Sequence, residues 1–416
     1  MSAPQPEQAG RPGWLVLLAL TLLVGLLCGA SATLFLAALA FVTELRIAWP
    51  ALVWFLPFVG FLMGAAYDRF GTIAGQGTQR VVRALTEGGH PLPRRFAPMV
   101  LLGTLATHLV GGSAGREGTA VQMGAGLADL IARRFAVTPA VRQRLLAAGV
   151  GGGFGAVFGT PVAGALFAAE FGAADRLRWR VIPVALLAAA VGDATTRGLG
   201  TEHFAFPTIT TAALSPDAFA RWLLLGLAIG LGARAFVATT HALRAAAEAR
   251  LPTRRLRLAA GGTLLLLLTL LLGSHDYLGL GLPLLRDAFE GAASGPSAFA
   301  LKLLFTTVTI AAGFIGGEVT PLFVIGALAG RAAAPLLGLP NGAAAGVAMV
   351  ALFGAAANAP LALIVMAAEL FGGGILPAAA LTTLVAWFVS GGTGIYGHRT
   401  IPLLARKPLH EARESV

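Results

Sequence analysis

Residues 155–170 read GAVFGTPVAGALFAAE, and residues 354–369 read GAAANAPLALIVMAAE. Each stretch begins with Gly, has Pro at its seventh position and ends in Ala-Ala-Glu. The two prolines, Pro161 and Pro360, are 199 residues apart (360 − 161). Proline interrupts a helix because it lacks the backbone N–H and clashes with the preceding turn. We therefore interpret the chain as two repeats, each with a helix break followed by an apolar helix.

Each repeat also contains an earlier glutamate beside glycines. Residues 115–119 read Gly-Arg-Glu-Gly-Thr, and residues 316–321 read Gly-Gly-Glu-Val-Thr-Pro. Glu117 and Glu318 are 201 residues apart (318 − 117), close to the spacing of the prolines. Both lie between apolar stretches, and ionisable groups at membrane depth are costly and mark ion pathways. The repeated order predicts a transporter whose pathway lies where broken helices of the two repeats meet.

The composition predicts an all-α integral membrane protein. Of the 416 residues, 56% are hydrophobic and 12% are charged, whereas a soluble domain has about 25% charged residues. The mean hydropathy is +0.79. Residues 12–43 and 332–368 are long charge-free runs, and a spanning helix needs about 20 apolar residues. Shorter runs at 222–233, 303–317 and 319–330 predict broken or half-spanning helices.

These patterns predict five parts along the chain. A polar cytoplasmic N-terminus covers residues 1–13, the first transmembrane repeat covers 14–200, and an inter-repeat loop covers 201–217. The second transmembrane repeat covers 218–396, and a short basic cytoplasmic tail covers 397–416. We expect a multi-pass protein of a bacterial-type inner (plasma) membrane.

The charge balance favours a membrane topology signal over a nucleic-acid surface. The net charge is +11 and the pI is about 11.3, as expected for arginines in cytoplasmic loops. These arginines are spread over several loops, so we predict no nucleic-acid binding. Cys28 is the sole cysteine, so no intrachain disulfide can form. The seven histidines have no metal-binding spacing, and we predict neither a metal nor a cofactor.

The glycine-flanked motifs resemble those of the CLC family of chloride channels and anion/proton antiporters. The anion-site motifs of that family are Gly-Ser-Gly-Ile-Pro, Gly-Arg-Glu-Gly-Pro and Gly-x-Phe-x-Pro, followed by a late tyrosine. The second motif corresponds to residues 115–119, the third to residues 317–321, and the tyrosine to Tyr396. The resemblance covers about residues 15–405. It implies a CLC-type fold of two inverted-topology repeats with many tilted and broken helices, and a homodimer with one ion path per subunit.

The departures from these motifs point to one branch of the family. The first motif is reduced to GQGTQ at residues 75–79, so Gln76 stands where the family has serine. Thr119 replaces the proline of the second motif, and Val319 replaces the phenylalanine of the third. Phe171 stands where chloride antiporters carry an inner proton-transferring glutamate. This combination is similar to the fluoride-selective branch, which implies fluoride/proton antiport, fluoride export from the cytoplasm and fluoride resistance.

Glu117 is the predicted gate and proton carrier of the site that this resemblance implies. Helix N-termini offer free N–H groups and a positive potential to an anion. Ionised Glu117 competes with the anion for those groups, because two negative charges cannot share the site cheaply. Protonated Glu117 leaves the site and takes the proton with it. We assign proton coupling to Glu318 as well, with capping of a broken helix as its structural alternative.

The remaining site residues are predicted to bind the anion or to support its site. The anion-binding candidates supply backbone, amide or hydroxyl donors: Gln76, Gly77, Gly118, Val319, Thr320 and Tyr396. The structural residues near the site are Gly115, Arg116 and Thr119. We expect Arg116 to neutralise a carboxylate, and Glu170 and Glu369 to accept hydrogen bonds from backbone N–H groups.

Two other functions remain open at this point. A chloride/proton antiporter or a chloride channel of the same fold is the first alternative. The second is a membrane-embedded enzyme that uses Glu117 or Glu318 as a general acid or base, but the sequence offers no convergent catalytic partners. We therefore predict that the protein is not an enzyme. Its expected partners are fluoride or chloride, protons, membrane lipid and a second copy of the chain.

Overall fold

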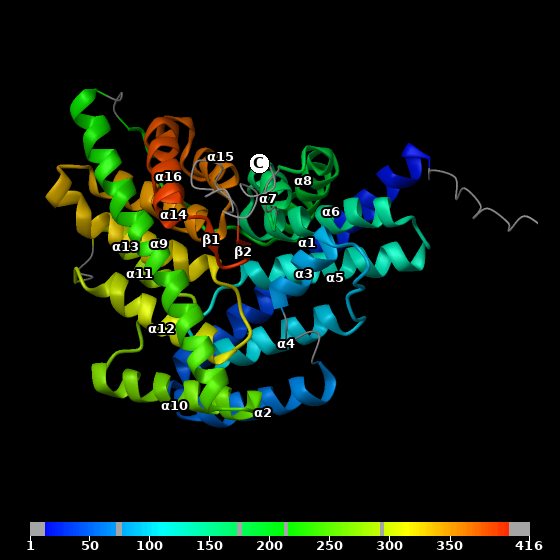
Figure 1. The fold of residues 1–416 in the computed structure, drawn as a ribbon, viewed down its shortest axis with the longest axis horizontal. Helices are drawn as coiled ribbons and strands as arrows, with labels where there is room; N and C mark the ends of the chain where they lie inside the picture. The colour runs from blue at the N-terminus through cyan, green and yellow to red at the C-terminus, as the bar shows by residue number, and fades with distance from the viewer. Residues whose placement is uncertain (1–12, 72–76, 173–176, 212–214, 292–294, 399–416) are drawn as a thin grey trace, which may run out of the picture.

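The computed structural model describes residues 13–71, 77–172, 177–211, 215–291 and 295–398. The first half of this part contains eight helices: α1 (Trp14–Ala48), α2 (Leu56–Phe70), α3 (Gly77–Thr86), α4 (Phe96–Leu109), α5 (Glu117–Arg134), α6 (Pro139–Phe158), α7 (Pro161–Glu170) and α8 (Ile182–Gly198). The second half contains α9 (Pro216–Arg250), α10 (Arg254–Leu272), α11 (Leu282–Glu290), α12 (Ala298–Ala312), α13 (Val319–Leu337), α14 (Asn341–Ala357), α15 (Pro360–Phe371) and α16 (Leu376–Ser390). The two halves lie side by side (Figure 1).

Short elements complete the described fold. Turns of 3-10 helix at Pro50–Phe55, Trp179–Val181 and Gly373–Ile375 precede α2, α8 and α16. A two-residue ribbon pairs β1 (Thr393–Gly394) with β2 (Gly397–His398) in antiparallel register. The fold is therefore all-α apart from this ribbon, as the sequence predicted.

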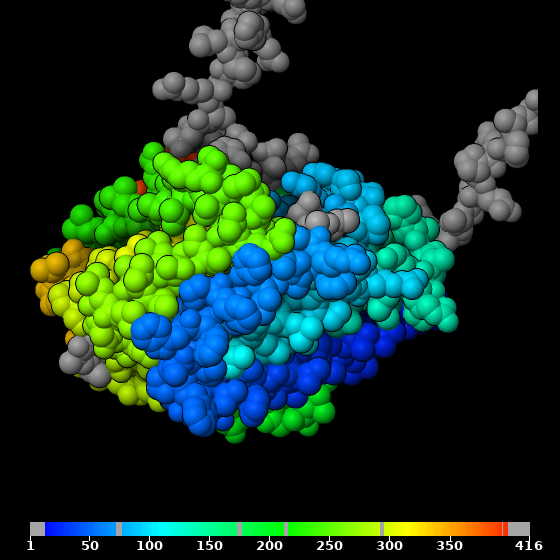
Figure 2. All heavy atoms as spheres, turned by 90° about the horizontal axis from the view of Figure 1, so that it is seen from below, coloured from blue at the N-terminus to red at the C-terminus, as the bar shows by residue number. Residues whose placement is uncertain are grey.

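The described helices fit a bilayer. Seven of them, some counted with the 3-10 turn that precedes them, are long and apolar enough to cross a membrane. Figure 2 views the face formed by α2 and α10, which carries large exposed apolar side chains: Phe58, Phe61, Leu62, Leu264, Leu267 and Leu271. Apolar side chains that face outward on long helices are expected where lipid, not water, is the solvent.

One predicted half-spanning helix is wrong. The charge-free run 222–233 lies within α9, which is a single continuous helix from Pro216 to Arg250. The arginine that ends the run, Arg234, is on an exposed position of this helix. A charge that faces outward limits the apolar run without breaking the backbone hydrogen bonds, so run length alone underestimated the helix.

The repeated helix break is built in the same way in both halves. Gly159 ends α6 in the left-handed conformation with φ +73°, and Pro161 starts α7. Asn358 ends α14 with φ +56°, and Pro360 starts α15. A left-handed residue closes a helix, and proline suits the first turn of the next helix because its missing N–H has no intrahelical partner there.

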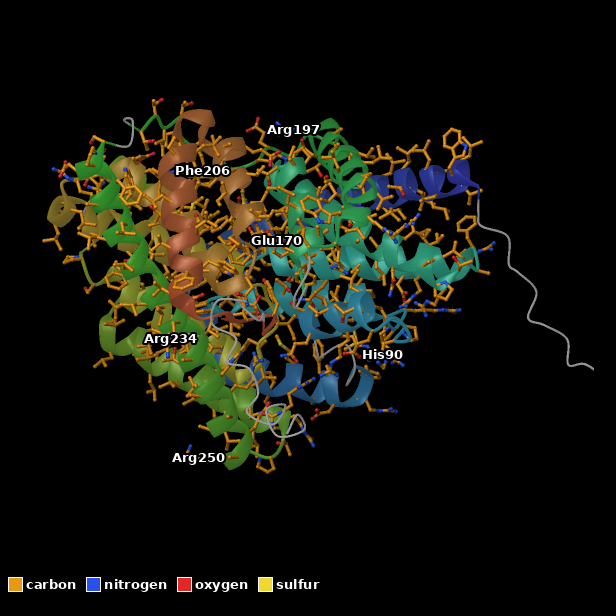
Figure 3. All side chains as sticks on the ribbon, turned by 45° about the horizontal axis from the view of Figure 1, so that its top comes forward. His90, Glu170, Arg197, Phe206, Arg234 and Arg250 are labelled. Atoms are coloured by element: carbon orange, nitrogen blue, oxygen red, sulfur yellow. The ribbon has the colours of Figure 1, made fainter. Side chains whose placement is uncertain are left out.

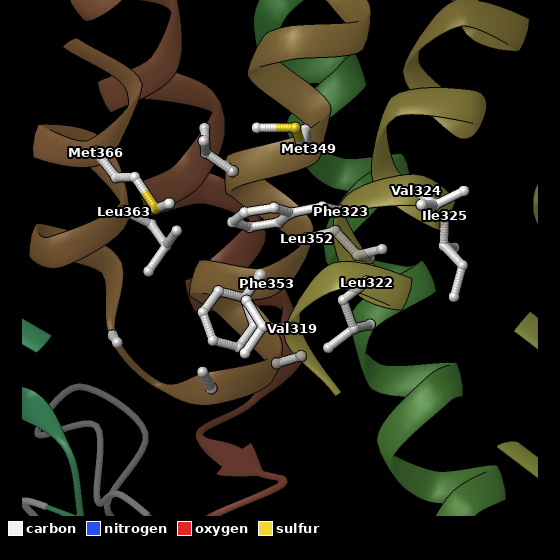
Figure 4. Packing of buried hydrophobic residues seen from close by; sticks show 14 of the residues in the cluster. Val319, Leu322, Phe323, Val324, Ile325, Met349, Leu352, Phe353, Leu363 and Met366 are labelled. Carbon is white, nitrogen blue, oxygen red and sulfur yellow. The ribbon is translucent and has the colours of Figure 1, made fainter. Parts of the chain in front are cut away.

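Small residues let the central helices cross closely, again twice. A Cβ atom added at Gly124 of α5 would lie 2.2 Å from the carbonyl oxygen of Gly149 on α6. A Cβ atom added at Gly330 of α13 would lie 2.2 Å from the carbonyl oxygen of Ala344 on α14. Larger side chains such as Phe323 and Phe353 fill the core around α13 and α14 (Figure 4). This use of small residues is typical of helix packing in membranes.

Glu170 and Glu369 join the two halves reciprocally. The carboxylate of Glu369, on α15, accepts hydrogen bonds from the N–H groups of Val162 (2.9 Å) and Ala163 (2.7 Å) at the start of α7. The carboxylate of Glu170, on α7, accepts hydrogen bonds from the N–H groups of Leu361 (3.3 Å) and Ala362 (2.8 Å) at the start of α15. Each glutamate thus caps the helix of the other repeat, and the predicted backbone-satisfying role is confirmed.

Removing one reciprocal cap is expected to destabilise the junction between the repeats. Glu170 lies near the middle of the molecule (Figure 3) and is 2% exposed. Glu170→Ala leaves the N–H groups of Leu361 and Ala362 without their acceptor, which costs about 1–3 kcal/mol of unfolding free energy. We expect a lower Tm in detergent, with Glu170→Gln intermediate because one carbonyl oxygen remains. Glu87→Gln at an exposed site is the control, and equal Tm values for all variants would contradict the capping role.

Candidate functional site

The starts of α5 and α13 meet at the centre of the molecule. The N–H of Gly115 donates to the carbonyl of Gly317 at 2.5 Å, and the N–H of Gly317 donates to the carbonyl of Gly115 at 2.8 Å. A Cβ atom added at Gly118 would lie 2.9 Å from the Cα atom of Gly317. Glycine at these positions therefore permits two helix N-termini to converge, where their free N–H groups create a positive potential.

The Glu117 carboxylate occupies this junction. Its Oε2 atom accepts hydrogen bonds from the N–H of Thr320 at 3.1 Å, from the Thr320 hydroxyl, and from the N–H of Arg116 at 3.3 Å. Its Oε1 atom lies 3.2 Å from Nε of Arg116. Glu117 is 1% exposed. A side-chain carboxylate from α5 thus occupies an anion position at the N-terminus of α13.

The helix starts show that the two glutamates occupy different positions in their repeats. Arg116 is the N-cap residue of α5 and Glu318 is the N-cap residue of α13, so these two positions correspond. Their separation is 202 (318 − 116) rather than 201, and the counterpart of Glu117 is Val319. Glu117 and Glu318 therefore project from different helix positions, which allows them different roles in anion binding and proton transfer.

Glu318 does not cap its own helix. Its side chain makes no capping hydrogen bond to the first turn of α13. The Tyr396 hydroxyl interacts with the Glu318 carboxylate. The Oε2 atom of Glu318 is buried and has no hydrogen-bond partner among the described residues. A carboxylate oxygen with spare acceptor capacity at this depth is suited to take up a proton.

A cavity of about 460 Å³ reaches this site from one side. Glu318 and Tyr396 line its deep end, and Arg244, Arg254 and Arg257 also line it. The positive-inside rule assigns a mouth rich in arginine to the cytoplasmic side, and we call this space the inner cavity. The inner cavity thus reaches as far as the Glu318–Tyr396 pair.

The opposite side is nearly closed. A space of about 20 Å³ beside Glu117 and Thr320 is lined in part by Phe158 and Phe206, and a space of that size holds about one water. Phe158 and Phe206 also line an outer cavity of about 600 Å³ that contains Arg197. Phe158 and Phe206 thus lie between Glu117 and the outer cavity, while Glu318 lines the inner cavity.

The structure brings most of the predicted site residues together, but not all of them. Gly115, Arg116, Glu117, Gly118 and Thr320 form the junction of the two helix starts. The other predicted residues are Gly77 and Tyr396, which line the inner cavity, Val319, which is buried at the start of α13, and Thr119, whose hydroxyl lies 2.7 Å from the Thr104 hydroxyl. Gln76 lies outside the described residues.

Gln122 is a site residue that sequence reasoning missed. It lies on α5 and is 4% exposed, and its Nε2 atom donates to the Thr78 hydroxyl at 3.0 Å. Both residues line the inner cavity next to Gly77. The signal was an amide side chain within an otherwise apolar helix turn, Ala-Val-Gln-Met-Gly at 120–124. Such a polar residue in a membrane helix faces a partner or a cavity.

The chain is similar to known proteins over most of its length. A model of the voltage gated chloride channel family matches residues 59–391. A chloride/fluoride channel protein from Pseudomonas syringae pv. tomato is 41% identical over 385 residues, which are 91% of this chain and 85% of the relative. The crystal structure of a CLC-type fluoride/proton antiporter is similar with a TM-score of 0.89 and 34% identity, over 92% of this chain and 97% of the other.

A further solved structure shares the fold. A slow cyanobacterial Cl⁻/H⁺ antiporter is similar with a TM-score of 0.80 and 22% identity, over 91% of this chain and 96% of the other.

Proposed function

Because the chain belongs to the voltage-gated chloride channel family, also called the CLC family, we propose that it is a fluoride/proton antiporter that exports fluoride. The observation that carries this proposal is the Glu117 carboxylate, held by Thr320 at the N-terminus of α13. The family consists of transporters and channels rather than enzymes, and this chain is a multi-pass inner-membrane protein. Two proteins that are more than 30% identical to this chain are a chloride/fluoride channel protein and a CLC-type fluoride/proton antiporter.

The exchange step follows from competition for one set of donors. While Glu117 is ionised, its Oε2 atom uses the Thr320 N–H and hydroxyl. Protonation removes the negative charge, weakens these hydrogen bonds and frees the donors for an anion. The neutral Glu117 side chain then leaves toward the narrow space lined by Phe158 and Phe206. There it exchanges its proton with either the outer cavity or the inner cavity. Anion and proton therefore alternate at the same position.

The donor set supports fluoride over chloride as the exported anion. Fluoride is small and strongly hydrated, so losing its water is costly unless strong donors lie close together. The Thr320 N–H and hydroxyl both point to one acceptor position, which Glu117 Oε2 now fills. The Tyr396 hydroxyl adds a donor at the inner end of the site. Hydrogen bonds to an ionised acceptor are short and strong, which suits the smaller anion.

The inner proton route is proposed to run through Glu318. Phe171, at the position where chloride antiporters have a glutamate, is 1% exposed and packs on Tyr396 with ring centroids 5.2 Å apart. An aromatic ring cannot carry a proton at that place. Glu318 is the carboxylate that lines the deep end of the inner cavity, and it has a buried oxygen without a hydrogen-bond partner among the described residues.

We extend the proposal to a homodimer of two-repeat subunits. The division into repeats 14–200 and 218–396 is supported by the reciprocal caps that Glu170 and Glu369 make across the junction. The dimer rests on family membership, and each subunit contains its own helix junction and its own pair of cavities. Cross-linking in membranes at low protein density tests the dimer, since a monomer alone would remove this part of the proposal.

Anion selectivity in proteoliposomes tests the transported ion. Vesicles loaded with fluoride or with chloride are diluted into ion-free buffer, with potassium and valinomycin carrying the compensating charge. We expect rapid fluoride efflux and slow chloride efflux. Chloride efflux equal to or faster than fluoride efflux would instead support the chloride antiporter or channel of the same fold.

Tyr396→Phe is expected to slow fluoride transport. The substitution keeps the ring contacts with Phe167 and Phe171 but removes the hydroxyl that faces Glu318. Losing one hydrogen bond to an anion costs about 1.5–3 kcal/mol, or roughly ten- to a hundredfold in affinity. The fluoride KM from the cytoplasmic side should rise accordingly. Tyr277→Phe serves as a tyrosine control outside the site, and an unaltered KM for Tyr396→Phe would make Tyr396 a packing residue.

A further inference from the structure

We propose that Thr240 and Arg244 on α9 form an additional fluoride-binding site in the inner cavity, one step before the site at the helix junction. This inference rests on the proposed function and names a residue pair outside the family motifs. It would give cytoplasmic fluoride a first binding position, from which the ion moves inward to Tyr396 and Thr320.

One face of α9 lines the inner cavity along its depth. Phe236, Thr240, Arg244 and Glu248 all line the cavity and are spaced four residues apart, so they lie on one side of the helix. Phe236 is fully buried, Thr240 is 3% exposed, Arg244 is half-buried and Glu248 is exposed. The face therefore changes from apolar to charged toward the mouth, and Thr240 and Arg244 are its middle pair.

Thr240 has an unused donor at this position. Its hydroxyl oxygen is buried and has no hydrogen-bond partner among the described residues. Other buried threonines, such as Thr104 and Thr269, donate to a carbonyl four residues earlier, each at 2.8 Å, whereas the Thr240 hydroxyl has no such bond within the described part of the chain and lies beside the cavity that Thr240 lines. A buried hydroxyl without a partner loses its interaction with water. An anion in the cavity is a partner of suitable chemistry.

Arg244 supplies the charge. One of its terminal nitrogens donates to the carbonyl of Ile310 at 3.3 Å, which orients the guanidinium. A guanidinium has five N–H donors, so further donors remain for an anion after this bond. Arg244 also interacts electrostatically with Glu318 at the deep end of the cavity. An ion held by Arg244 is therefore within electrostatic range of the carboxylate proposed to pass protons.

The surrounding charge favours an anion over a cation. Arg254 and Arg257 line the same cavity as Arg244, whereas Glu248 is the acidic side chain on its outer part. A concave surface with a positive excess raises the local anion concentration and the association rate, and both effects fall with ionic strength. Fluoride would meet Arg244 before it reaches the uncharged donors of Tyr396 and Thr320.

Arg244→Gln and Thr240→Val test the site by their effect on cytoplasmic fluoride. Initial efflux from proteoliposomes is measured over a range of internal fluoride at low and high ionic strength. We expect Arg244→Gln to raise the fluoride KM about tenfold and Thr240→Val about threefold, from the loss of one charged and one neutral hydrogen bond. Arg244→Gln should also flatten the rise of KM with salt that the wild type shows. Arg250→Gln, at the exposed end of α9 outside the cavity lining, should match the wild type.

The outcomes separate this inference from the proposed function. A wild-type protein that moves no fluoride would overturn the function and the site together. Fluoride transport with unchanged KM and salt dependence in both variants would overturn the Thr240–Arg244 site alone. If Arg244→Gln fails to fold, Thr240→Val decides, because the two side chains have nearly the same shape. Partial rescue of KM by Arg244→Lys would assign the effect to charge rather than to the bond with Ile310.

Discussion

Glu117→Gln abolishes proton movement through the protein, which is the largest effect expected of any single substitution. The glutamine side chain has the shape of protonated glutamate but cannot bind and release a proton. If Glu117 carries every transported proton, proton flux falls to the level of protein-free vesicles. The measurement is the external pH change during fluoride efflux, with fluoride flux recorded in the same vesicles.

The same substitution should change how well the site binds anions. The Glu117 carboxylate takes hydrogen bonds from the Thr320 N–H, the Thr320 hydroxyl and the Arg116 N–H. A neutral amide competes less strongly for these donors, by about 2 kcal/mol or roughly thirtyfold. Fluoride should therefore bind more tightly to Glu117→Gln than to the wild type, even though coupled exchange has stopped.

An acidic residue away from the junction provides the control. Glu202 lines the outer cavity and is exposed, so Glu202→Gln removes a negative charge near the path without touching Glu117. This variant should retain coupled exchange. Proton transport that persists in Glu117→Gln at the wild-type rate would remove Glu117 from the proton path.

Glu318→Gln is expected to slow proton transport strongly while leaving the anion-binding position at Thr320 intact. Glu318 lines the deep end of the inner cavity beside Tyr396, and its Oε2 atom is buried without a hydrogen-bond partner among the described residues. The Thr320 donors belong to the first turn of α13 and do not bond to Glu318. Proton uptake per fluoride released should therefore fall, and fluoride binding measured at equilibrium should persist.

Glu248→Gln is the matched control for Glu318. Glu248 lines the same cavity nearer the mouth, so its substitution changes the cavity charge by the same amount. A proton-to-fluoride ratio that falls only in Glu318→Gln assigns the proton relay to that carboxylate. Equal proton-to-fluoride ratios in the two variants and the wild type would show that Glu318 does not carry protons. Protons would then reach Glu117 through water in the inner cavity.

The sequence predicted the architecture well because both repeats use the same residue types at their helix breaks and helix ends. A proline after a helix break and a glutamate at a helix end are readable from residue order, and the structure adds the reciprocity between Glu170 and Glu369. No sequence signal said that each glutamate caps the helix of the other repeat. That depends on which helix ends meet in space, which the order of residues alone does not specify.

The site was only partly predictable for a related reason. Gly115, Glu117 and Gly118 could be found from glycine next to a charge, but the spacing of Glu117 and Glu318 did not show that Glu318 alone is a helix N-cap residue. Gln122 and Thr240 were missed because an amide or hydroxyl on a membrane helix commonly bonds within its own helix. Their importance appears only when the inner cavity is seen to lie beside them.

Coupled exchange of fluoride and protons through Glu117 is measured by following both ions in one vesicle preparation. Wild-type proteoliposomes loaded with potassium fluoride are diluted into weakly buffered medium at equal internal and external pH, and valinomycin is added. We expect fluoride to leave and the external pH to rise with it in constant proportion, with no pH change in Glu117→Gln. Fluoride efflux without proton uptake in the wild type would contradict antiport and identify a channel.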